Sequence, residues 1–493
     1  MFVENAKNIA FKSSALLDDL KKLESKMLQA LNNKRTVIQS LPSSQRLSAE
    51  NLILYLALRS QDIRGLQDQL HIAGLSSLTS SESHIHRQLQ AILERMGEDI
   101  DESSLSKCDY TTGNELIDKR SILLFGEKKD QSIPHIMVTF DTSFVDNLQL
   151  IKKLLEAGMN VARINCAHDD EKTWDNMIGL VKEASEKTGM PCKIYMDLAG
   201  PRLRTNLLGK GRQEGKASLM EGQELMLAEL DADYDPSAIV INCSEPGIVK
   251  QLKVDDRVLF DDGVIETKVT NVNNGIAGLR IIRASAHKPR LKVGKGMNFP
   301  DSDLNLPALT MADRELIPYL CERADLIGYS FVRDASGVKE LQKLLNEFYS
   351  RPSIILKIET PQAVNNLPAL LLQGMMDEAF GVMIARGDLA VEIGFERLSE
   401  IQDEIAWISE AAHAPIIWAT QVLETLNKSG IATRSEMTDA SHAVMAECVM
   451  LNKGDHIIKV IKSLKDILQR SGTHRMKKRY TFRPMQIAKN YIE

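Results

Sequence analysis

A cation and an anion stand close together near the end of one apolar run in this sequence. The segment SIILKIET, residues 353–360, has the composition of a buried strand, yet it contains Lys357 and Glu359. Side chains two positions apart in a strand point to the same face. An ammonium and a carboxylate side by side suit a site that stabilises a developing oxyanion or holds a metal ion.

Other apolar runs in the chain also finish with polar residues. These residues are Arg163 and Asn165, Asp197, Arg386 and Asp388, and Thr420. Each one alone could be an ordinary surface group, and a lone Lys-x-Glu is commonly a surface pair. Gathered at one edge of a sheet, they would form a mouth with several cations and at least two carboxylates.

The residue types restrict the chemistry of such a mouth. Glu359 and Asp388 offer hard oxygen ligands that suit Mg²⁺ or Mn²⁺, and no accompanying His or Cys suggests zinc. Arg163 and Arg204 carry the planar guanidinium that binds phosphate oxygens in pairs. No nucleophile–base pair, P-loop or G-x-G-x-x-G motif accompanies them. The set indicates phosphoryl transfer or enolate chemistry, in which positioning and electrostatics dominate.

Eight short apolar runs alternate with helical segments from residue 134 onward. They are IMVTF (136–140), NVARINC (160–166), CKIYMDL (192–198), LIGYSFV (326–332), SIILKIE (353–359), GVMIARGD (381–388), PIIWAT (415–420) and CVML (448–451). Runs that are apolar on both faces and separated by amphipathic helices are typical of a parallel sheet. Eight such units predict an α/β fold, a (β/α)8 TIM barrel, whose catalytic groups lie at the carboxyl ends of the strands.

One connection between these runs is much longer than a barrel loop. Residues 199–325 contain AIVINC, DRVLFDDGVIETKVTNV and GIAGLRIIRAS, which alternate in polarity and are separated by turn signals such as DDG and NNG. We expect an inserted small β-barrel lid domain over residues 207–293. The catalytic barrel would then comprise residues 134–206 and 294–465.

Residues 1–130 are predicted to form a helical N-terminal extension without catalytic groups. The apolar stripe of its first helix consists of Leu16, Leu20, Leu23, Met27 and Leu31. A second helical run ends near Gly74, and Thr79 with Glu82 predicts a capping box for a third helix that ends near Gly97. The polar composition of residues 98–132 indicates a linker.

Composition excludes several classes of function. The chain of 493 residues has a net charge of −6, so no basic excess indicates a nucleic-acid partner. It has no apolar run of the length that a membrane span needs, and its N-terminal segment lacks the apolar core of a secretion signal. The 6 cysteines form no C-x-x-C pair. We therefore expect a cytoplasmic protein without structural zinc or disulfides, and a basic, solvated C-terminal tail over residues 466–493.

Several of these segments resemble the pyruvate kinase family. LLEAGMNVARINCAH, MDLAGPRLRT, ILKIET, MIARGDLAVEI, ATQVLETL and ATRSEMTDASHAV look like its catalytic barrel, and DRVLFDDGVIETKV and KVGKGMNFP look like its lid. The likeness runs in the expected order from residue 134 to 465, about two thirds of the chain. It implies the family's glycolytic activity, the Mg²⁺-dependent transfer of a phosphoryl group from phosphoenolpyruvate to ADP.

The resemblance implies a role for each matching residue around the enolate. Lys357 would stabilise the enolate and the transferring phosphoryl group, and Glu359 and Asp388 would bind the divalent metal. Thr420 would lie near the site that protonates the enol carbon. The backbone around Gly387 and Asp388 would hold the substrate carboxylate at the start of a helix.

Further matches concern the phosphate and the nucleotide. Arg163 matches a phosphate-binding arginine, and Ser330 matches a serine near the metal. The residues implied on the nucleotide side are Asn165, His168, Arg204 and Lys295, together with Asp262, a lid residue that closes over the site.

The sequence departs from the family pattern at the monovalent-cation site. The resemblance implies ligands from Asn165 and Asp197, but Ala167 stands where the family has a serine. Arg202 replaces a glutamate that is common in K⁺-dependent members. A cationic side chain there could supply the missing charge, so we expect activity without K⁺. A plain surface charge is the alternative for Arg202.

Other departures concern the loops and the ends of the chain. VTFDTS replaces TIGPAS after the first strand, and MLNKGDHI replaces a longer loop of the SGET type. No segment resembles the C-terminal domain in which many members bind a sugar-phosphate activator, so activation by that route is not expected. The helical extension resembles that of a divergent pyruvate kinase-like group in bacteria and plants.

Three functional interpretations remain open at this stage. The leading one is a kinase that converts phosphoenolpyruvate and ADP into pyruvate and ATP. The second is a lyase or aldolase that uses the same metal and enolate stabilisation, although the lid residues Asp262 and Lys295 argue against it. The third is a non-catalytic regulator that binds partners through its N-terminal helices. A homo-oligomer is expected in each case.

Overall fold

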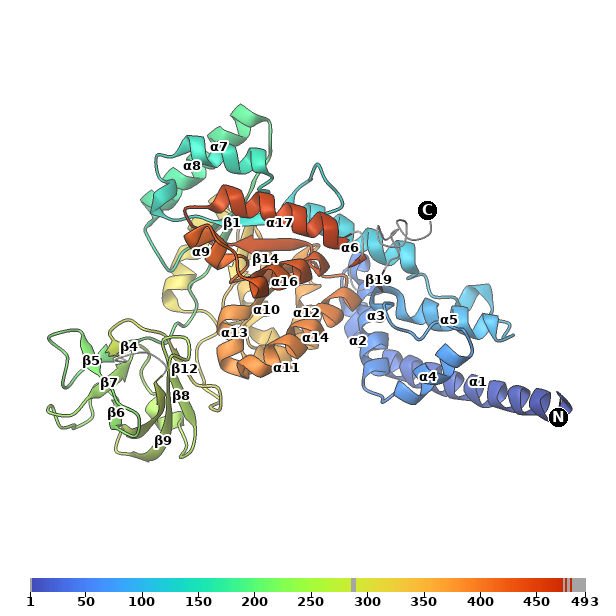
Figure 1. Cartoon of the computed structure of the whole chain (residues 1–493), viewed down its shortest axis with the longest axis horizontal. Helices are drawn as coiled ribbons and strands as arrows, with labels where there is room; N and C mark the ends of the chain where they lie inside the picture. Colours follow the sequence, from blue (N-terminus) through green and yellow to red (C-terminus); the bar gives the residue numbers. More distant parts are fainter. Residues whose placement is uncertain (1, 285–289, 473–474, 477–478, 481–493) are drawn as a thin grey trace.

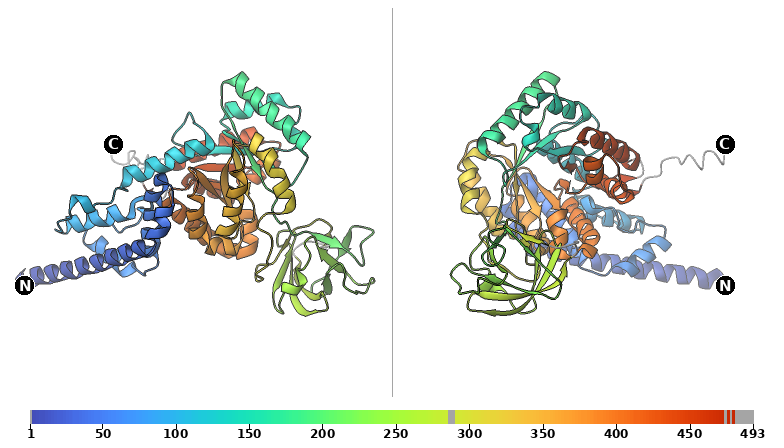
Figure 2. Two further views of the ribbon diagram at one scale, coloured as in Figure 1. Left: turned by 180° about the vertical axis from the view of Figure 1, so that it is seen from behind. Right: turned by 60° about the vertical axis from the view of Figure 1, so that its left-hand side comes forward.

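A closed barrel lies at the centre of the structure, between a helical N-terminal region and a separate β insert (Figure 1). The computed structural model describes residues 2–284, 290–472, 475–476 and 479–480. The N-terminal helices and the β insert lie on opposite sides of the barrel (Figure 2). The predicted architecture of a (β/α)8 barrel with a small β insert and a helical extension is confirmed.

The barrel consists of the eight strands that the apolar runs predicted. They are β1 (His135–Thr139), β2 (Val161–Asn165), β3 (Lys193–Asp197), β13 (Leu326–Tyr329), β14 (Ser353–Ile358), β15 (Phe380–Ala385), β16 (Ile416–Ala419) and β17 (Cys448–Leu451). All neighbours pair in parallel, and β17 pairs with β1 to close the barrel. Parallel strands place their carboxyl ends at one rim, so the polar residues that end them share one mouth.

Helices cover the outside of the barrel and connect its strands. They are α7 (Leu148–Ala157), α8 (Glu171–Thr188), α9 (Met311–Arg323), α10 (Ala335–Leu345), α11 (Pro361–Asn365), α12 (Leu367–Gly374), α13 (Arg386–Ile393), α14 (Leu398–Ala411), α15 (Glu424–Ser429), α16 (Arg434–His442) and α17 (Ile457–Gly472). Short 3₁₀ turns are η3 (Thr142–Phe144), η5 (Phe395–Arg397) and η6 (Ala443–Met445). Thr310 and Thr433 form capping boxes that start α9 and α16, so these helices begin where the sequence supplies a side-chain acceptor.

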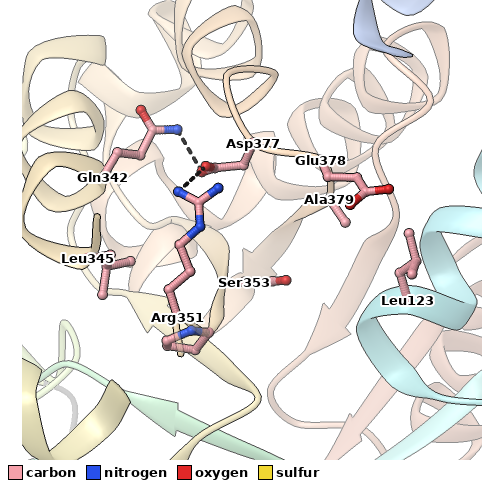
Figure 3. Close-up of a pocket in the computed structure, with 9 residues that line it drawn as sticks. Leu123, Gln342, Leu345, Arg351, Ser353, Asp377, Glu378 and Ala379 are labelled. Atoms are coloured by element: carbon pink, nitrogen blue, oxygen red, sulfur yellow. Dashed lines mark hydrogen bonds and ion pairs between the residues drawn. The ribbon is translucent and has the colours of Figure 1, made fainter. Parts of the chain in front are cut away.

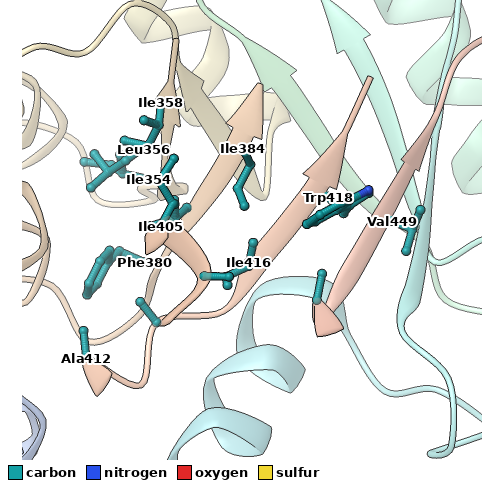
Figure 4. Packing of buried hydrophobic residues seen from close by; sticks show 14 of the residues in the cluster. Ile354, Leu356, Ile358, Phe380, Ile384, Ile405, Ala412, Ile416, Trp418 and Val449 are labelled. Atoms are coloured by element: carbon teal, nitrogen blue, oxygen red, sulfur yellow. The ribbon is translucent and has the colours of Figure 1, made fainter. Parts of the chain in front are cut away.

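Strand periodicity divides the barrel residues between two apolar layers. Ile354, Leu356 and Ile358 of β14 belong to the layer between strands and helices (Figure 4). Ile355 points the other way and belongs to a second cluster, inside the barrel. Lys357 has the same parity as Ile355, so its side chain enters the barrel interior at the rim.

The predicted linker at residues 98–132 is wrong, because this segment contains helix α6 (Tyr110–Phe125) and the turn η2 (Glu102–Ser104). Leu124 and Phe125 at the end of α6 are fully buried and join the cluster inside the barrel. The helix therefore closes the barrel at the amino ends of its strands. Glu115, Asp118 and Lys119 face outward while Arg120 and Ser121 are buried, and together these polar residues gave the segment the composition of a linker.

Five further helices and one turn make up the N-terminal region. They are α1 (Phe2–Asn33), α2 (Arg35–Ser40), α3 (Ser43–Arg59), α4 (Arg64–Ile72), η1 (Glu82–His84) and α5 (Ile85–Arg95). The stripe predicted for the first helix is confirmed, since Leu16, Leu20, Leu23 and Met27 are buried.

Two predictions for this region are wrong. The second helical run is divided into α3 and α4, because residues 60–63 leave the helix. The capping box of Thr79 and Glu82 does not form, because the Thr79 hydroxyl lies 3.0 Å from that of Ser77 and helix α5 begins later, after η1.

A buried polar network attaches the N-terminal region to the barrel. Arg120 of α6 is 3% exposed and donates to the carbonyls of Ala412 and His413, which follow α14. It also donates to the Ser48 hydroxyl of α3. Burial lowers the pKa of Arg120 to about 10, because its acceptors are neutral groups. Each donor is satisfied only when the helices and the barrel are assembled.

The β insert follows β3 and has its own apolar core. Its strands are β4 (Thr205–Leu207), β5 (Lys216–Ser218), β6 (Glu224–Ala228), β7 (Val240–Cys243), β8 (Arg257–Phe260), β9 (Ile265–Asn273), β10 (Ile276–Ala284), β11 (Arg290–Lys292) and β12 (Met297–Asn298), with a 3₁₀ turn η4 (Val249–Gln251). Seven strands form one sheet in the order β12-β8-β9-β10-β6-β7-β4, and β11 pairs with β5. Leu227, Phe260 and Leu279 are fully buried between them.

The last barrel helix, α17, continues to Gly472, past the start of the predicted tail at residue 466. A short hairpin of β18 (Arg475–Met476) and β19 (Arg479–Tyr480) follows it. The rest of the predicted solvated tail, residues 481–493, lies outside the described residues. No helix in the described part of the chain is long and apolar enough to span a membrane.

Candidate functional site at the barrel mouth

Lys357 occupies the centre of a buried polar cluster at the mouth of the barrel. Its Nζ donates to Ser330 Oγ at 2.6 Å and lies 3.2 Å from Glu359 Oε1 and 3.5 Å from Asp197 Oδ1. The residue is 4% exposed. The ammonium group of Lys357 therefore lies where strands β13, β14 and β3 end. It is close to Glu359, as the spacing of the two residues indicated. A desolvated ammonium at this position can stabilise an oxyanion that forms beside it.

Arg163 and Asp197 form a buried ion pair next to this cluster. Arg163 Nε donates to Asp197 Oδ2 at 2.7 Å, its Nη1 donates to Thr139 Oγ1, and the Tyr195 hydroxyl donates to Asp197 Oδ1 at 2.7 Å. Burial opposes the charge on Asp197, but Arg163 and Lys357 outweigh it and hold its pKa below the ordinary value.

The strand next to Asp197 has no room for a side chain. A Cβ atom on Gly328 of β13 would overlap Asp197 Oδ1 and the Tyr195 hydroxyl. Glycine at this position is what allows the Tyr195–Asp197 contact to form against the neighbouring strand.

Glu359 and Asp388 provide two carboxylates that fit a hard divalent cation. Glu359 is 2% exposed and accepts a hydrogen bond from the Phe331 N–H at 2.5 Å. Burial and the like charge of Asp388 raise the pKa of Glu359, although Lys357 acts in the opposite direction. The repulsion between two carboxylates of like charge favours a bound cation. Among the described residues, no three His, Cys, Asp or Glu side chains are arranged to hold a metal by themselves, so water and substrate oxygens would complete its shell.

Thr420 stands in a strained backbone conformation beside the start of α13. Its φ is 67°, in the left-handed region that β-branched residues rarely adopt. Arg386 holds this turn by donating to the carbonyls of Ala419 and Thr420, and it is paired with Asp439. Thr420 Oγ1 is buried without a hydrogen-bond partner among the described residues, and a Cβ on Gly387 would lie 3.6 Å from it. The hydroxyl is therefore a buried polar atom whose hydrogen-bonding capacity is unused among the described residues.

The predicted nucleotide side lies between the β insert and the barrel. Arg204, Lys295 and Asp262 line a cavity of about 570 Å³ there, together with Arg202 and Asp388. Lys295 Nζ is paired with Asp261 Oδ1 at 2.7 Å, and Arg204 donates to the Gly294 carbonyl at 2.6 Å. Each cation has further N–H donors beyond these contacts with which to bind phosphate.

Asn165 and His168 do not line this cavity. Asn165 Oδ1 accepts from the Ala167 N–H at 3.2 Å. Burial and the cations Arg202, Arg204 and Lys453 lower the pKa of His168, so these basic groups surround it. No ion pair joins Arg202 to Asp197 in the part of the chain that the structure describes.

Several residues of the mouth were not identified from the sequence. Tyr195 and Thr139 contact the Asp197–Arg163 pair, and Tyr195 could have been found because it has the same strand parity as Asp197. Lys453 binds Asp141 at 2.8 Å across two loops that are far apart in the chain. Burial raises the pKa of Glu392 to about 7, and this residue accepts from Asn298 Nδ2 at 2.7 Å. No local pattern indicates the last two contacts.

Two other cavities are less suited to chemistry. One of about 220 Å³ lies near the start of β14, where Arg351 and Gln342 bind Asp377 and where Glu378 also lines the cavity (Figure 3). The other, of about 990 Å³, lies between α6 and the amino ends of the strands and is lined by Tyr110, Lys128 and His135. The latter is at the end of the barrel opposite the mouth.

Comparisons with known proteins agree with this geometry. A family model for the pyruvate kinase barrel domain matches residues 134–456. Pyruvate kinase from Bacillus licheniformis is 31% identical over 334 residues, covering 66% of this chain and 55% of that protein. The enzyme from Dictyostelium discoideum is 35% identical over 304 residues, covering 61% of this chain and 58% of its own length. The chain therefore spans a little more than half the length of these relatives.

A solved structure shows the same likeness in three dimensions. The crystal structure of a pyruvate kinase from Cryptosporidium parvum matches with a TM-score of 0.62 and 26% identity, over 71% of this chain and 72% of that one. The match of the family model extends over more than half of the sequence, through the barrel and its β insert. This chain belongs to the pyruvate kinase family.

Proposed function

We propose that this protein transfers the phosphoryl group of phosphoenolpyruvate to ADP and releases pyruvate and ATP. The observation that carries the proposal is the buried cluster in which Lys357 contacts Ser330, Glu359 and Asp197. A cluster of this kind costs stability, because three ionisable groups are desolvated together. Its presence at the mouth, beside Asp388 and Thr420, supports an active site.

The reaction breaks the bond between phosphorus and the enol oxygen, and an oxygen of the ADP β-phosphate forms the new bond to phosphorus. Arg163 would orient the phosphoryl group, and Lys357 would stabilise the negative charge left on the enol oxygen. The enolate then takes a proton on its methylene carbon, at the side where Thr420 lies. Glu359 and Asp388 would hold Mg²⁺ or Mn²⁺, which when bound would neutralise charge on the phosphoryl and enolate oxygens.

The β insert supports a nucleotide substrate over a simple 2-oxo acid reaction. The cavity beneath it is lined by Arg202, Arg204 and Lys295, three cations suited to a polyphosphate. A lyase or aldolase would need the metal and Lys357 but not this cationic cavity. We further propose that turnover does not require K⁺, because Arg202 would supply a positive charge where K⁺-dependent members commonly have a glutamate. The homo-oligomer and the cytoplasmic location remain predictions.

The test is pyruvate formation by the purified full-length chain from phosphoenolpyruvate, ADP and Mg²⁺, with either K⁺ or Na⁺. Lys357→Met should lower turnover by about 10²–10³-fold, the loss typical of one group that stabilises an oxyanion. Lys339→Met, which removes an exposed lysine of α10, serves as the control. No turnover by the wild type with either salt would overturn the proposal. Retained metal-dependent phosphoenolpyruvate binding in that case would favour another enolate reaction or a regulatory role.

A further inference from the structure

The β insert is joined to the barrel by a narrow stalk of two antiparallel segments. The Thr205 N–H donates to the Lys295 carbonyl at 2.8 Å, and the Gly294 N–H donates to the Thr205 carbonyl at 2.7 Å. The Met297 N–H donates to the Leu203 carbonyl at 2.9 Å. Two segments hold the insert close to the barrel, but they restrain the angle between the insert and the barrel only weakly. Side-chain contacts must therefore set that angle.

One buried side-chain contact ties the end of this stalk to the barrel. Asn298 of β12 is 8% exposed, and its Nδ2 donates to Glu392 Oε1 at 2.7 Å. Glu392 lies on α13, one helical turn after Asp388. The insert is therefore bonded directly to the helix that carries a predicted metal ligand.

The insert reaches the same helix from a second side. Strand β12 pairs with β8, and the turn after β8 consists of Asp261, Asp262 and Gly263, all with positive φ. A Cβ on Gly263 would lie 3.8 Å from Val391 and 4.0 Å from Phe395, so this turn sits against α13 and η5. With Asn298 on one side and the turn on the other, the position of Asp262 depends on α13.

The segment after the stalk is hydrogen-bonded to the insert. Arg257 of β8 binds Asp301 in two parallel hydrogen bonds of 2.8 Å, and Ser302 donates to Asp256 at 2.7 Å. These contacts make residues 299–302 part of the insert. Asn298 thus lies where the insert, together with residues 299–302, meets the barrel. At this junction a single hydrogen bond has the greatest effect on the angle between the insert and the barrel.

We propose that the Asn298–Glu392 hydrogen bond is a latch that sets the angle of the β insert over the barrel mouth. Glu392 and Asn298 both line the cavity beneath the insert, and in this proposal Glu392 is a positioning residue, because it acts through Asn298 and the stalk. The latch keeps Asp262, Arg204 and Lys295 opposite Asp388 and so maintains the cavity of about 570 Å³ between them. Its effect on nucleotide affinity rests on the proposed function, whereas its effect on the angle of the insert does not.

The first experiment measures the angle without any need for activity. Nitroxide labels at Met220→Cys on the insert and Ile431→Cys on the barrel occupy exposed positions, with the half-buried Cys166 and Cys192 replaced by alanine. Double electron–electron resonance should give one narrow distance distribution for the latched chain. Asn298→Ala and Glu392→Ala should each broaden it, and Glu392→Gln, which keeps an acceptor oxygen, should restore it. An unchanged distribution in Glu392→Ala would overturn the latch.

A control and a second readout separate the latch from loss of folding. Glu224→Ala breaks an exposed ion pair with Arg280 within the insert and should leave the distribution unchanged. In the kinetic assay, Asn298→Ala and Glu392→Ala should each raise the KM for ADP about tenfold, the effect of losing one hydrogen bond to a charged group. The double variant should add nothing further, and the KM for phosphoenolpyruvate should not change. Additive effects of the two variants would contradict a shared latch. If the wild type shows no phosphoryl transfer, the proposed function fails while the distance measurement still decides the latch.

Discussion

Arg163 of β2 forms an ion pair with Asp197 of β3, with Arg163 Nε 2.7 Å from Asp197 Oδ2, although the strand register places Arg163 opposite Tyr195. Asp197 is fully buried and also contacts Lys357 and Tyr195. Asp197 is therefore the ion-pair partner of Arg163 and shares Lys357 with Glu359, which lies 3.2 Å from the Lys357 ammonium. The charges of the mouth are thus balanced through a network in which Asp197 links the two cations.

Replacing Asp197 with Asn should destabilise the folded chain strongly. The change leaves Arg163 buried without its ion-pair partner and leaves Lys357 paired with Glu359 alone, and breaking a buried pair typically costs about 3–5 kcal/mol. Urea unfolding followed by circular dichroism would measure the loss. Asp233→Asn, at an exposed position of the insert, should change the free energy of unfolding by less than about 0.5 kcal/mol. A similar small effect at Asp197 would show that the ion pair is not important for the fold.

Removing Glu359 should abolish high-affinity binding of the divalent metal. Glu359→Gln retains the size of the side chain but removes a charge that the cation needs. Binding of Mn²⁺, followed by electron paramagnetic resonance, should weaken by at least the about 10–100-fold that is typical when a supporting residue is lost. Glu396→Gln, at an exposed position of η5, is the matched control. Equal affinities in both variants would place the metal elsewhere.

Arg202 should determine whether turnover depends on K⁺. The wild type should turn over no faster in K⁺ than in an equal concentration of Na⁺. Arg202→Glu introduces the glutamate that is common in K⁺-dependent members of the family. The activity of this variant should therefore be low in Na⁺ and should recover in K⁺. Initial rates at matched ionic strength would measure both. A K⁺ requirement in the wild type would refute the proposed role of Arg202.

Phe125 should be one of the residues on which assembly of the N-terminal region depends. Its ring is 1% exposed and lies in the cluster inside the barrel. Phe125→Ala removes that packing and leaves a cavity, which should cost about 3–5 kcal/mol. Leu123→Ala on the same helix changes a side chain that is 44% exposed and should cost much less. Calorimetric unfolding would compare the two variants, and equal melting temperatures would show that α6 does not close the barrel.

His135 should make the protein sensitive to acid. Burial, with a smaller effect from Lys128, lowers the pKa of His135 from 6.5 to about 4. The folded state therefore favours the neutral imidazole over the protonated one. The resulting contribution to the free energy of unfolding is fully present above pH 6.5, the ordinary pKa, and is lost as the pH falls through 4. Its upper limit is about 3 kcal/mol, at about 1.4 kcal/mol per pKa unit. Unfolding free energies from pH 7 to 4 should show a shallower slope for His135→Gln, whereas the exposed His71→Gln should follow the wild type.

Local patterns in the sequence were sufficient for the elements of the barrel and for one part of its site. The eight apolar runs became strands because a strand buried on both faces must be apolar along its length. Lys357 and Glu359 were placed together by the period of two, a property of the backbone that needs no tertiary information. The same reasoning failed for α6, because its polar residues, among them the buried Arg120 and Ser121, obscured the apolar end that contains Leu124 and Phe125.

Contacts between distant segments were decided only by the tertiary structure. Three such contacts each join residues from different elements. They are the Arg163–Asp197 ion pair, the hydrogen bond from Arg386 to the Thr420 carbonyl and the Asn298–Glu392 hydrogen bond. The surroundings then shifted their pKa values: Arg163 and Lys357 hold the pKa of Asp197 low against the effect of burial, whereas burial raises the pKa of Glu392. A sequence specifies which groups are available, whereas desolvation and Coulomb interactions depend on distances that exist only after the chain has folded.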